Sequence, residues 1–473
     1  ISGGGNAMQG ADNNTILQNL PDGVINVNNG NGMYASNLAS PTNYGTINVQ
    51  EGVGMYLTGM TLSGATTGSN YGSINVSGWG NYGALVSNGA VFTNQGVISV
   101  SCADCEGGQY AIGMGGGSNL GAISVKEYGI GIEYGENNGE IGIGADSAIG
   151  MRGGINNGVI GGNSTASGTG MSGGENNGTI DIYSGTGMKN GINNGGITVN
   201  NGTGMNNGTN NSTIDVTNGN GGVASNGGMF TNHGEITVGS GNGILVQSGG
   251  YGVNSASGTI TLAGKGYGAK VEDGDFLNAG TINFSSKNGG SCANVSVGGE
   301  CVDNVDETET TSANGLIYIG KNGTFINSGV VDMNGETVDF DSMRDEESGA
   351  FVVAKGGTYK ADSFKGAVVA GKDIVKGGFE DKYVNENSFE GKNEGLSVSS
   401  GSYMFDAALK DNGDSVDVEM ARKEFDTLVE DKEIAGFLET NYKLENNEAM
   451  YDALKDAEDK ATFDETTRLE TGQ

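Results

Sequence analysis

One short motif recurs through most of this 473-residue chain: Asn, any residue, Gly, any residue, Ile, a polar residue, and then Val or another apolar residue. A clear copy is Asn43-Tyr44-Gly45-Thr46-Ile47-Asn48-Val49. The central apolar residue marks fourteen copies, and successive markers up to Ile282 lie 17 to 27 positions apart. The markers are Ile25, Ile47, Ile74, Ile98, Ile123, Ile141, Ile160, Ile180, Ile197, Ile214, Ile236, Ile260, Ile282 and Val331. A repeat of this length indicates stacked units, each too small to fold alone.

The alternation of Ile, a polar residue and Val is typical of a half-buried strand. A second strand between the copies carries Gly, any residue, Gly and then Met or another apolar residue, as in Gly52-Val53-Gly54-Met55. Such short strands gain partners when each repeat forms one coil of a solenoid. Seven coils carry a Met that we expect to pack inside: Met33, Met55, Met114, Met151, Met171, Met188 and Met205.

The fold predicted from this pattern is an all-β solenoid, a right-handed parallel β-helix with a short C-terminal α-helical segment. Right-handed crossovers are the strong default for parallel strands, and the strict hexapeptide period of the left-handed kind is absent from the sequence. Glycines at the corners are expected to adopt positive φ.

Twelve markers have Asn four positions earlier, where a strand turns into the next. Stacked in neighbouring coils, these amides are expected to bond to one another in a ladder. The exceptions are Pro21 and Ala256. The predicted ladder consists of Asn43, Asn70, Asn94, Asn119, Asn137, Asn156, Asn176, Asn193, Asn210, Asn232, Asn278 and Asn327.

Composition narrows the class of protein. Glycine supplies 91 residues and proline only 2, which excludes collagen, and 35% apolar residues argue against a low-complexity linker. A formal charge of −33 would repel nucleic acid and anionic membrane surfaces, so we expect neither as a partner. The start, Ile1-Ser2-Gly3-Gly4-Gly5, lacks the features of a signal peptide, so we expect a segment of a larger protein.

Changes of pattern divide the chain into four parts. We expect regular coils over residues 1–284, a cysteine-containing acidic insertion over 285–323, capping coils over 324–417, and an amphipathic helical segment over 418–473. Acidic residues number 18 up to position 300 and 38 after it, and basic residues number 6 and 17, so the C-terminal third differs in charge.

The four cysteines form two local groups, Cys102 with Cys105 and Cys292 with Cys301. About eight coils separate the groups, so we expect a local disulfide within each group, with free thiols as the alternative. A structural zinc site is disfavoured because it needs four ligands, and the single histidine, His233, is many coils away.

The Asn-x-Gly-x-Ile-x-Val coils, followed by capping coils and an acidic helical tail, resemble the passenger of a type V autotransporter. The coil motif is most similar to the very large fusobacterial autotransporter adhesins. The closing segment, with Phe463-Asp464 near its start and Leu469-Glu470-Thr471-Gly472 at its end, resembles the family's segment just before the outer-membrane barrel. Thr471 stands where the family usually has Ser, and the sequence contains no barrel.

The resemblance implies type V secretion, display on the bacterial cell surface and a role in cell adhesion and virulence. It implies a covalently linked outer-membrane barrel in the full-length protein, and a host-cell or bacterial surface glycoconjugate or receptor protein as partner. We expect a monomer and a non-enzymatic adhesin segment, which is either a stiff stalk or a binding surface. Its C-terminal coils are expected to help folding after export.

The alternative is a polysaccharide-processing β-helix enzyme, either a lyase or a hydrolase, which needs clustered carboxylates or a positioned base. Asp181 and Asp215 lie two coils apart, about 10 Å, and are expected to point outward singly. His233 is expected to be a solvated corner residue. We therefore assign no catalytic residue, no cofactor and no metal ligand, and leave open weak calcium binding by residues 303–309.

Aromatic residues beside glycine corners give the best indication of a binding surface. Exposed rings stack on sugars and on protein partners. The candidate ligand-binding residues are Tyr44, Tyr56, Tyr71, Trp79 and Tyr82, although some of them could instead pack in the core or in corner stacks.

Overall fold

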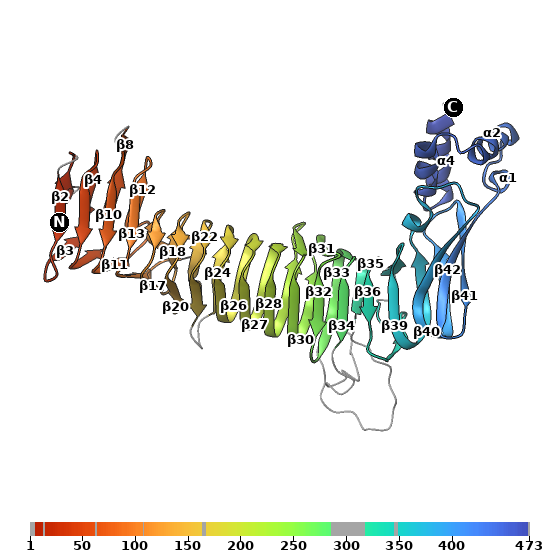
Figure 1. Ribbon diagram of the computed structural model, residues 1–473, viewed down its shortest axis with the longest axis horizontal. Coiled ribbons are helices and arrows are strands. Elements are labelled where there is room, and N and C mark those ends of the chain that lie inside the picture. The colour runs from red at the N-terminus through yellow and green to blue at the C-terminus, as the bar shows by residue number, and fades with distance from the viewer. Residues whose placement is uncertain are drawn as a thin grey trace, which may run out of the picture. The chain divides into compact units, whose positions relative to one another are not determined.

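The structure is a computed structural model that describes residues 5–12, 15–61, 64–106, 108–162, 167–284, 317–344 and 349–471. Contacts within the chain define two compact units, 1–223 with 234–238, and 224–233 with 239–473. The division falls inside strands β28 (Thr213–Ala224) and β30 (Glu235–Val246). Both units are built mainly from parallel strands (Figure 1).

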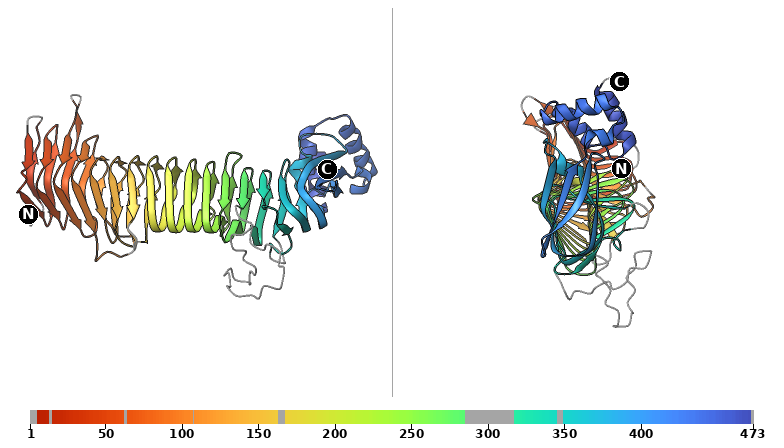
Figure 2. Two further views of the ribbon diagram at one scale, coloured as in Figure 1. Left: turned by 60° about the horizontal axis from the view of Figure 1, so that its bottom comes forward. Right: turned by 90° about the vertical axis from the view of Figure 1, so that its right-hand side faces the viewer.

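In unit 1, each coil contributes up to three strands, and equivalent strands lie side by side along the stack (Figure 2). We call the columns A, B and C in chain order around one coil. Column A holds β2 (Ile16–Asn19), β5 (Ser40–Asn43), β10 (Thr67–Asn70), β13 (Val91–Asn94), β16 (Ser118–Asn119), β19 (Glu136–Asn137), β22 (Ile155–Asn156) and β25 (Glu175–Asn176). Column B holds β3 (Val24–Val27), β6 (Thr46–Val49), β11 (Ser73–Ser77), β14 (Val97–Ser101), β17 (Ala122–Val125), β20 (Glu140–Ile143) and β23 (Val159–Gly162).

Column C holds β1 (Gly5–Gly10), β4 (Gly30–Ser36), β7 (Val53–Thr58), β12 (Tyr82–Ser87), β15 (Ala111–Gly115), β18 (Gly129–Glu133), β21 (Ile149–Arg152) and β24 (Ser167–Ser172). Farther along, the columns run together in β26 (Thr179–Asn193) and β27 (Gly196–Asn210), each of which continues through the corners of a coil. A small antiparallel hairpin, β8 (Met60–Thr61) with β9 (Gly64–Ala65), projects from an early coil.

The pairing register follows the sequence motif. Ile74 pairs in parallel with Ile47 in one direction and with Ile98 in the other. The side chains of these markers and the Met residues of column C are buried, because both point into the stack. The parallel solenoid predicted from the motif is therefore present, and its core is a repeated column of Ile, Val and Met.

Buried asparagines form a ladder along the corner between columns A and B. All twelve predicted asparagines are fully buried. In unit 1 the amide Nδ2 of each donates to Oδ1 of the next at 2.7–2.8 Å, in an unbroken run from Asn19 to Asn210. In unit 2, Asn232, Asn254, Asn278 and Asn327 continue the same pattern at 2.8–2.9 Å.

Two ladder members were missed by the sequence motif. Asn19 and Asn254 occupy the ladder in the coils of Ile25 and Ile260, six positions before the marker. The side-chain amide of each donates to the backbone carbonyl of a glycine four residues later, Gly23 or Gly258. An ordinary ladder member, such as Asn43, donates to the carbonyl of the residue two positions later. Pro21 and Ala256 therefore lie in longer corners, and the ladder itself is intact.

Positive φ explains only part of the corner glycine content. Gly72, in the A–B corner, has no positive φ; a Cβ there would overlap the carbonyl oxygen of Gly45 in the neighbouring coil. Gly202, in the B–C corner, has φ +141°, and a Cβ there would overlap the carbonyl oxygen of Gly185 in the neighbouring coil. Close approach of stacked backbones is thus the more general requirement.

Unit 2 continues with coils whose strands pair in parallel. They are β29 (Met229–Asn232), β31 (Gly250–Asn254), β32 (Thr259–Leu262), β33 (Gly266–Asn278), β34 (Thr281–Phe284), β35 (Ile317–Asn327), β36 (Val330–Asp332), β37 (Thr337–Asp339), β38 (Ala350–Val353) and β39 (Thr358–Ala370). Residues 317–323, which we placed in the insertion, belong to β35, where Ile317 pairs with Ala269. The rest of that insertion, with Cys292, Cys301 and the acidic run, lies outside the described residues.

The end of the solenoid differs from the capping coils expected over residues 324–417. After a 3-10 helix, η1 (Lys372–Val375), strand β40 (Lys382–Ser400) pairs in parallel with β39 on one side. On the other side it pairs antiparallel with β42 (Ser415–Arg422), which in turn pairs antiparallel with β41 (Phe405–Asp411). An antiparallel sheet thus covers the last coil.

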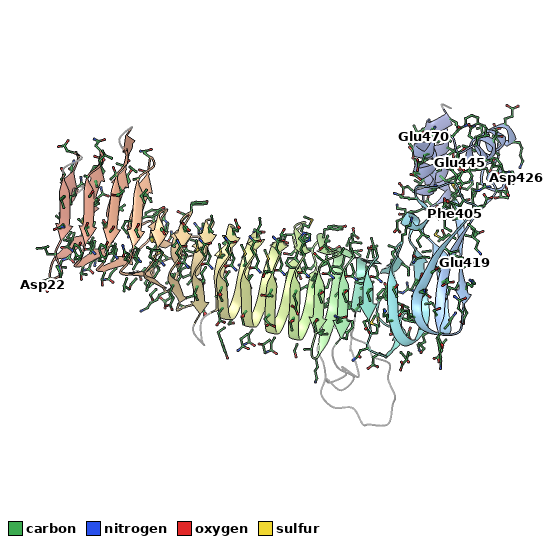
Figure 3. The ribbon with its side chains drawn as sticks, in the orientation of Figure 1. Asp22, Phe405, Glu419, Asp426, Glu445 and Glu470 are labelled. Atoms are coloured by element: carbon green, nitrogen blue, oxygen red, sulfur yellow. A yellow bond between two sulfur atoms is a disulfide. The ribbon has the colours of Figure 1, made fainter. Side chains whose placement is uncertain are left out.

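Four helices follow the sheet: α1 (Phe425–Leu428), α2 (Lys432–Lys443), α3 (Glu448–Lys455) and α4 (Lys460–Thr471). The helical segment begins a few residues later than predicted, because residues 418–422 belong to β42. Figure 1 shows α1, α2 and α4 near one end of β41 and β42. Phe405, labelled in Figure 3, is buried, whereas the labelled acidic residues Asp426, Glu445 and Glu470 are exposed.

Arg422 joins the terminal sheet to α2. Its side chain is 2% exposed and donates two hydrogen bonds of 2.9 Å to the Glu439 carboxylate and one of 2.7 Å to Asp381. The guanidinium also lies 4.6 Å from the ring centre of Tyr442. Phe437 of the same helix is 52% exposed, although the helical segment was predicted to be amphipathic.

Candidate binding surface

The five aromatic candidates occupy three different places in unit 1. Tyr44 and Tyr71 follow ladder asparagines in neighbouring coils, and their rings stack with centres 5.2 Å apart and planes 10° apart. Both are nearly half exposed, and the amide of Gln95 donates to the Tyr71 hydroxyl at 3.1 Å. This pair forms a flat aromatic surface at the A–B corner.

The other three candidates lie away from this pair. Tyr56 is in column C, where its ring meets Tyr34 edge-on at 5.6 Å. Trp79 is 67% exposed in the B–C corner, between Gly78 and Gly80, which both have positive φ. Tyr82 begins β12 and extends over later coils of column C. The structure therefore does not bring the five together as one patch.

Tyr82 belongs to a polar and aromatic cluster that the sequence did not reveal. Its hydroxyl donates to Glu133 Oε2 at 3.4 Å, and Glu133 pairs with Arg152 at 3.2 Å. The Arg152 guanidinium lies 4.7 Å from the ring centre of Tyr110. Burial and the Glu133 carboxylate raise the pKa of the Tyr82 hydroxyl, so it stays a donor at neutral pH. The sequence alone does not bring these residues together, because their proximity depends on the pairing register of column C.

A polar groove runs along the outer face of column B, with a volume of about 390 Å³. Because side chains alternate along each strand, the first and the third residues after the marker face outward. The first row includes Asn48, Asn75 and Ser99, which pair in register. We call this the amide groove and define it by Asn48, Asn75, Ser99, Gln50, Ser101 and Lys126, all of which line it.

Amides in the groove bond to one another and leave groups available to a ligand. Asn75 Nδ2 donates to Asn48 Oδ1 at 2.8 Å. Among the residues that the structure describes, the side chains of Gln50, Ser99 and Ser101 and the ammonium of Lys126 form no bond with another residue. The next coil offers Gly142 and Gly144 at the outward positions, so the lined part of the groove ends at Lys126.

The residues weighed for catalysis do not converge. Asp181 and Asp215 are both exposed. One coil lies between them, because Thr198 pairs with Asp181 on one side and with Asp215 on the other. His233 is exposed, with Nδ1 2.7 Å from Ser255 Oγ, a contact that sequence spacing did not predict. Ser257 Oγ donates to the His233 carbonyl at 2.9 Å. Within the described residues, no carboxylate bonds to the His233 ring.

Cys102 and Cys105 are joined by a disulfide, with Cα atoms 5.3 Å apart. Both are buried, and the Cys102 amide donates to the Glu127 carbonyl of the next coil at 2.8 Å. Cys102 directly follows Ser101, so the disulfide loop adjoins the amide groove. The second expected pair, Cys292 with Cys301, lies outside the described residues.

Within the described parts of the chain, no group of three or more His, Cys, Asp or Glu side chains is placed to hold a metal ion. None of the described helices, the longest of which have 12 residues, is long and apolar enough to span a membrane. No protein-family model, no curated protein and no solved structure matches this chain.

Proposed function

We propose that this chain is a non-enzymatic adhesive segment of a protein displayed on a bacterial cell surface. The observation that carries the proposal is the contrast between the inside and the outside of the coils. Inside, equivalent positions stay apolar from coil to coil; outside, positions in the same register change between aromatic, charged and small side chains. Such a scaffold presents a varied surface on a constant frame.

Column C illustrates this contrast. The inner position is apolar and buried in every coil; it carries Met33, Met55, Ala84, Met114, Ile132, Met151, Met171 and Met188. The next position of the same strands faces outward and carries, in register, Tyr34, Tyr56, Leu85, Gly115, Glu133, Arg152, Ser172 and Lys189. Aromatic, acidic, basic and small side chains therefore follow one another along a single outer row. Binding surfaces of repeat proteins are built in this way.

The sequence resemblance supports the location and the class of partner. Coils followed by an acidic helical tail are similar to autotransporter adhesins, and that similarity favours a surface-exposed passenger that binds a glycoconjugate or a receptor protein. The terminal sheet and helices close the last coil, which supports a role in starting the fold after export. The coils are proposed to be right-handed, following the strong preference of parallel crossovers.

A bead adhesion assay tests the proposal. Beads coated with the full chain are incubated with host epithelial cells and with bacteria, over a range of chain densities. We expect saturable attachment that soluble chain competes away. Two double variants, Trp79→Ala with Tyr82→Ala and Tyr44→Ala with Tyr71→Ala, then locate the adhesive surface, because they remove aromatic rings from different parts of unit 1.

Attachment lost in only one variant locates the adhesive surface. No attachment of beads, while cells that carry the full-length protein still adhere, would reject a binding role and make the chain a stalk. The alternative function, polysaccharide processing, predicts shortened or unsaturated sugars in the medium of the same assay, whereas an adhesive segment leaves the glycans intact.

A further inference from the structure

The lining of the amide groove has the hydrogen-bonding groups that a carbohydrate site needs. Most of its lining side chains are amides or hydroxyls, which donate to and accept from sugar hydroxyl groups. Its volume of about 390 Å³ lies within the range of ligand sites. Stacked coils repeat the lining about every 4.8 Å, which is close to the length of one sugar ring. A linear ligand lying along the stack would meet equivalent polar groups coil after coil.

Lys126 is the charged group of this lining, and it stands at one end. Lysine is scarce here: residues 1–300 hold only six basic residues. Arg152 and Lys270 are paired with Glu133 and Glu272, whereas Lys126 has no ion pair among the described residues. An unpaired ammonium beside available hydroxyl groups would bind a carboxylate or sulfate with a charge-assisted hydrogen bond.

The single positive charge of the lining limits how many negative groups such a ligand can carry. Salt screens charges beyond about 8 Å, so only charges close to the groove act on a bound ligand. Lys126 can pair with one negative group, whereas a charge on every sugar would leave the other negative groups without a cation in the lining. The groove therefore fits a mostly neutral chain with one acidic end.

We infer that the amide groove binds a linear glycan that is neutral along its length and carries one acidic sugar at the Lys126 end. Asn75, Gln50, Ser99 and Ser101 bond the hydroxyl groups of the neutral sugars, and Lys126 pairs with the acidic group. This inference rests on the proposed adhesive function, and it names the class of ligand and the surface that holds it.

Titration of matched probes against the full chain tests the inference. The probes are lacto-N-tetraose, the same tetrasaccharide with one terminal sialic acid, the same tetrasaccharide with one terminal sulfate, and heparin as a polyanion. We expect the two singly charged probes to bind about tenfold more tightly than the neutral one, since a hydrogen bond to a charged group contributes on this scale. Heparin is expected to bind no better than the neutral probe.

Two variants assign the effect to the groove. Lys126→Gln should remove the tenfold advantage of the charged probes and leave binding of the neutral probe unchanged. Lys189→Gln is the matched control: it makes the same charge change at an exposed lysine of column C and should have no effect. Ser99→Tyr fills the groove from an outward position and should abolish binding of every probe, with an unchanged circular dichroism spectrum.

Equal affinity for charged and neutral probes, stronger binding of heparin, or an unaffected Lys126→Gln variant would each overturn the inference. Bead attachment to cells that survives in Ser99→Tyr would also overturn the groove as the adhesive site and leave the adhesive function standing. Probe binding in the groove without any attachment to cells would instead reject the proposed function.

Discussion

A buried asparagine amide contributes to this fold only when its neighbours in the adjacent coils are also asparagines. Asn137 donates to Asn156 Oδ1 at 2.7 Å and accepts from Asn119 Nδ2 at 2.8 Å, with no exposed surface. A net hydrogen bond is worth about 1 kcal/mol, but a buried polar group without a partner costs about 1–3 kcal/mol. The ladder therefore disfavours any misaligned stacking of coils.

Replacing Asn137 by Ala should destabilise unit 1 by about 2–4 kcal/mol, because one donor and one acceptor in the neighbouring coils lose their partner. Asn138→Ala is the matched control: Asn138 is exposed, donates to Ser118 Oγ at 3.1 Å and accepts from Asn157 Nδ2 at 3.1 Å. Water can replace these exposed bonds, so the loss should stay within about 0.5 kcal/mol. Urea unfolding followed by circular dichroism compares the two. Equal unfolding midpoints for both variants would mean that the buried asparagine ladder adds no more stability than an exposed hydrogen bond.

Gly202→Ala should be more disruptive than a typical surface substitution. The residue has φ +141°, which an L side chain rarely adopts, and its Cβ would meet the Gly185 carbonyl. By contrast, Gly436→Ala in α2 has open space around it and should stabilise the helix by up to about 1 kcal/mol. Thermal unfolding of the two variants should shift in opposite directions; a gain in stability for Gly202→Ala would refute the close approach of these coils.

At the residue scale, the sequence predicted most of the inner frame. A four-residue offset from the marker identified twelve ladder asparagines, and the buried Met column followed from its regular spacing. Asn19 and Asn254 were missed because their corners are two residues longer. The partners of outward residues, such as Tyr82 with Glu133 across 51 positions, needed the register of the stacked coils.

At the scale of elements, the terminal sheet and helices depend on charged contacts. Burial opposes ionisation of Glu439, but hydrogen bonds from Arg422 and Lys443 outweigh it and lower the pKa of the carboxyl group to about 2. Removing either partner would leave a charge in a largely enclosed place, which is costly. The contact thus holds α2 against β42.

The lowered pKa of Glu439 predicts a loss of stability in acid. A carboxyl group whose folded pKa is depressed stabilises the fold above its unfolded pKa, and this contribution disappears as the pH falls through the folded value. Protection of α2 amides from hydrogen exchange should therefore decline between about pH 4.5 and about pH 2. Glu439→Gln should weaken protection at neutral pH and flatten this decline; an unchanged pH dependence in the variant would contradict the assignment.

The antiparallel end of the solenoid was not predicted from the sequence, because short apolar strands look alike whether they pair in parallel or antiparallel. β40, β42 and β41 lack the Asn corner, and that absence alone indicated only that regular coils had ended. The amide groove was missed for a related reason. Its residues lie 24 to 27 positions apart along the chain, and each polar residue alone looks like ordinary solvent-facing surface.

At the scale of the molecule, the repeated coils and most of the charged residues occupy different parts of the chain. The regular coils up to residue 300 carry few charges, and their outer rows present amides, hydroxyls and aromatic rings; most acidic residues follow later in the chain. A nearly neutral repeated surface suits contact with hydroxyl-rich ligands, since carbohydrate binding relies on hydrogen bonds and ring stacking. Unit 1 therefore combines an apolar interior with an exterior whose side chains vary from coil to coil.

The most direct test of this account is to measure binding of the labelled full chain to intact cells while analysing by mass spectrometry the sugars that are released into the medium. The account predicts saturable, competable binding and no released glycan. Shortened or unsaturated sugars in the medium, or cell association that never saturates, would contradict a non-enzymatic adhesive function.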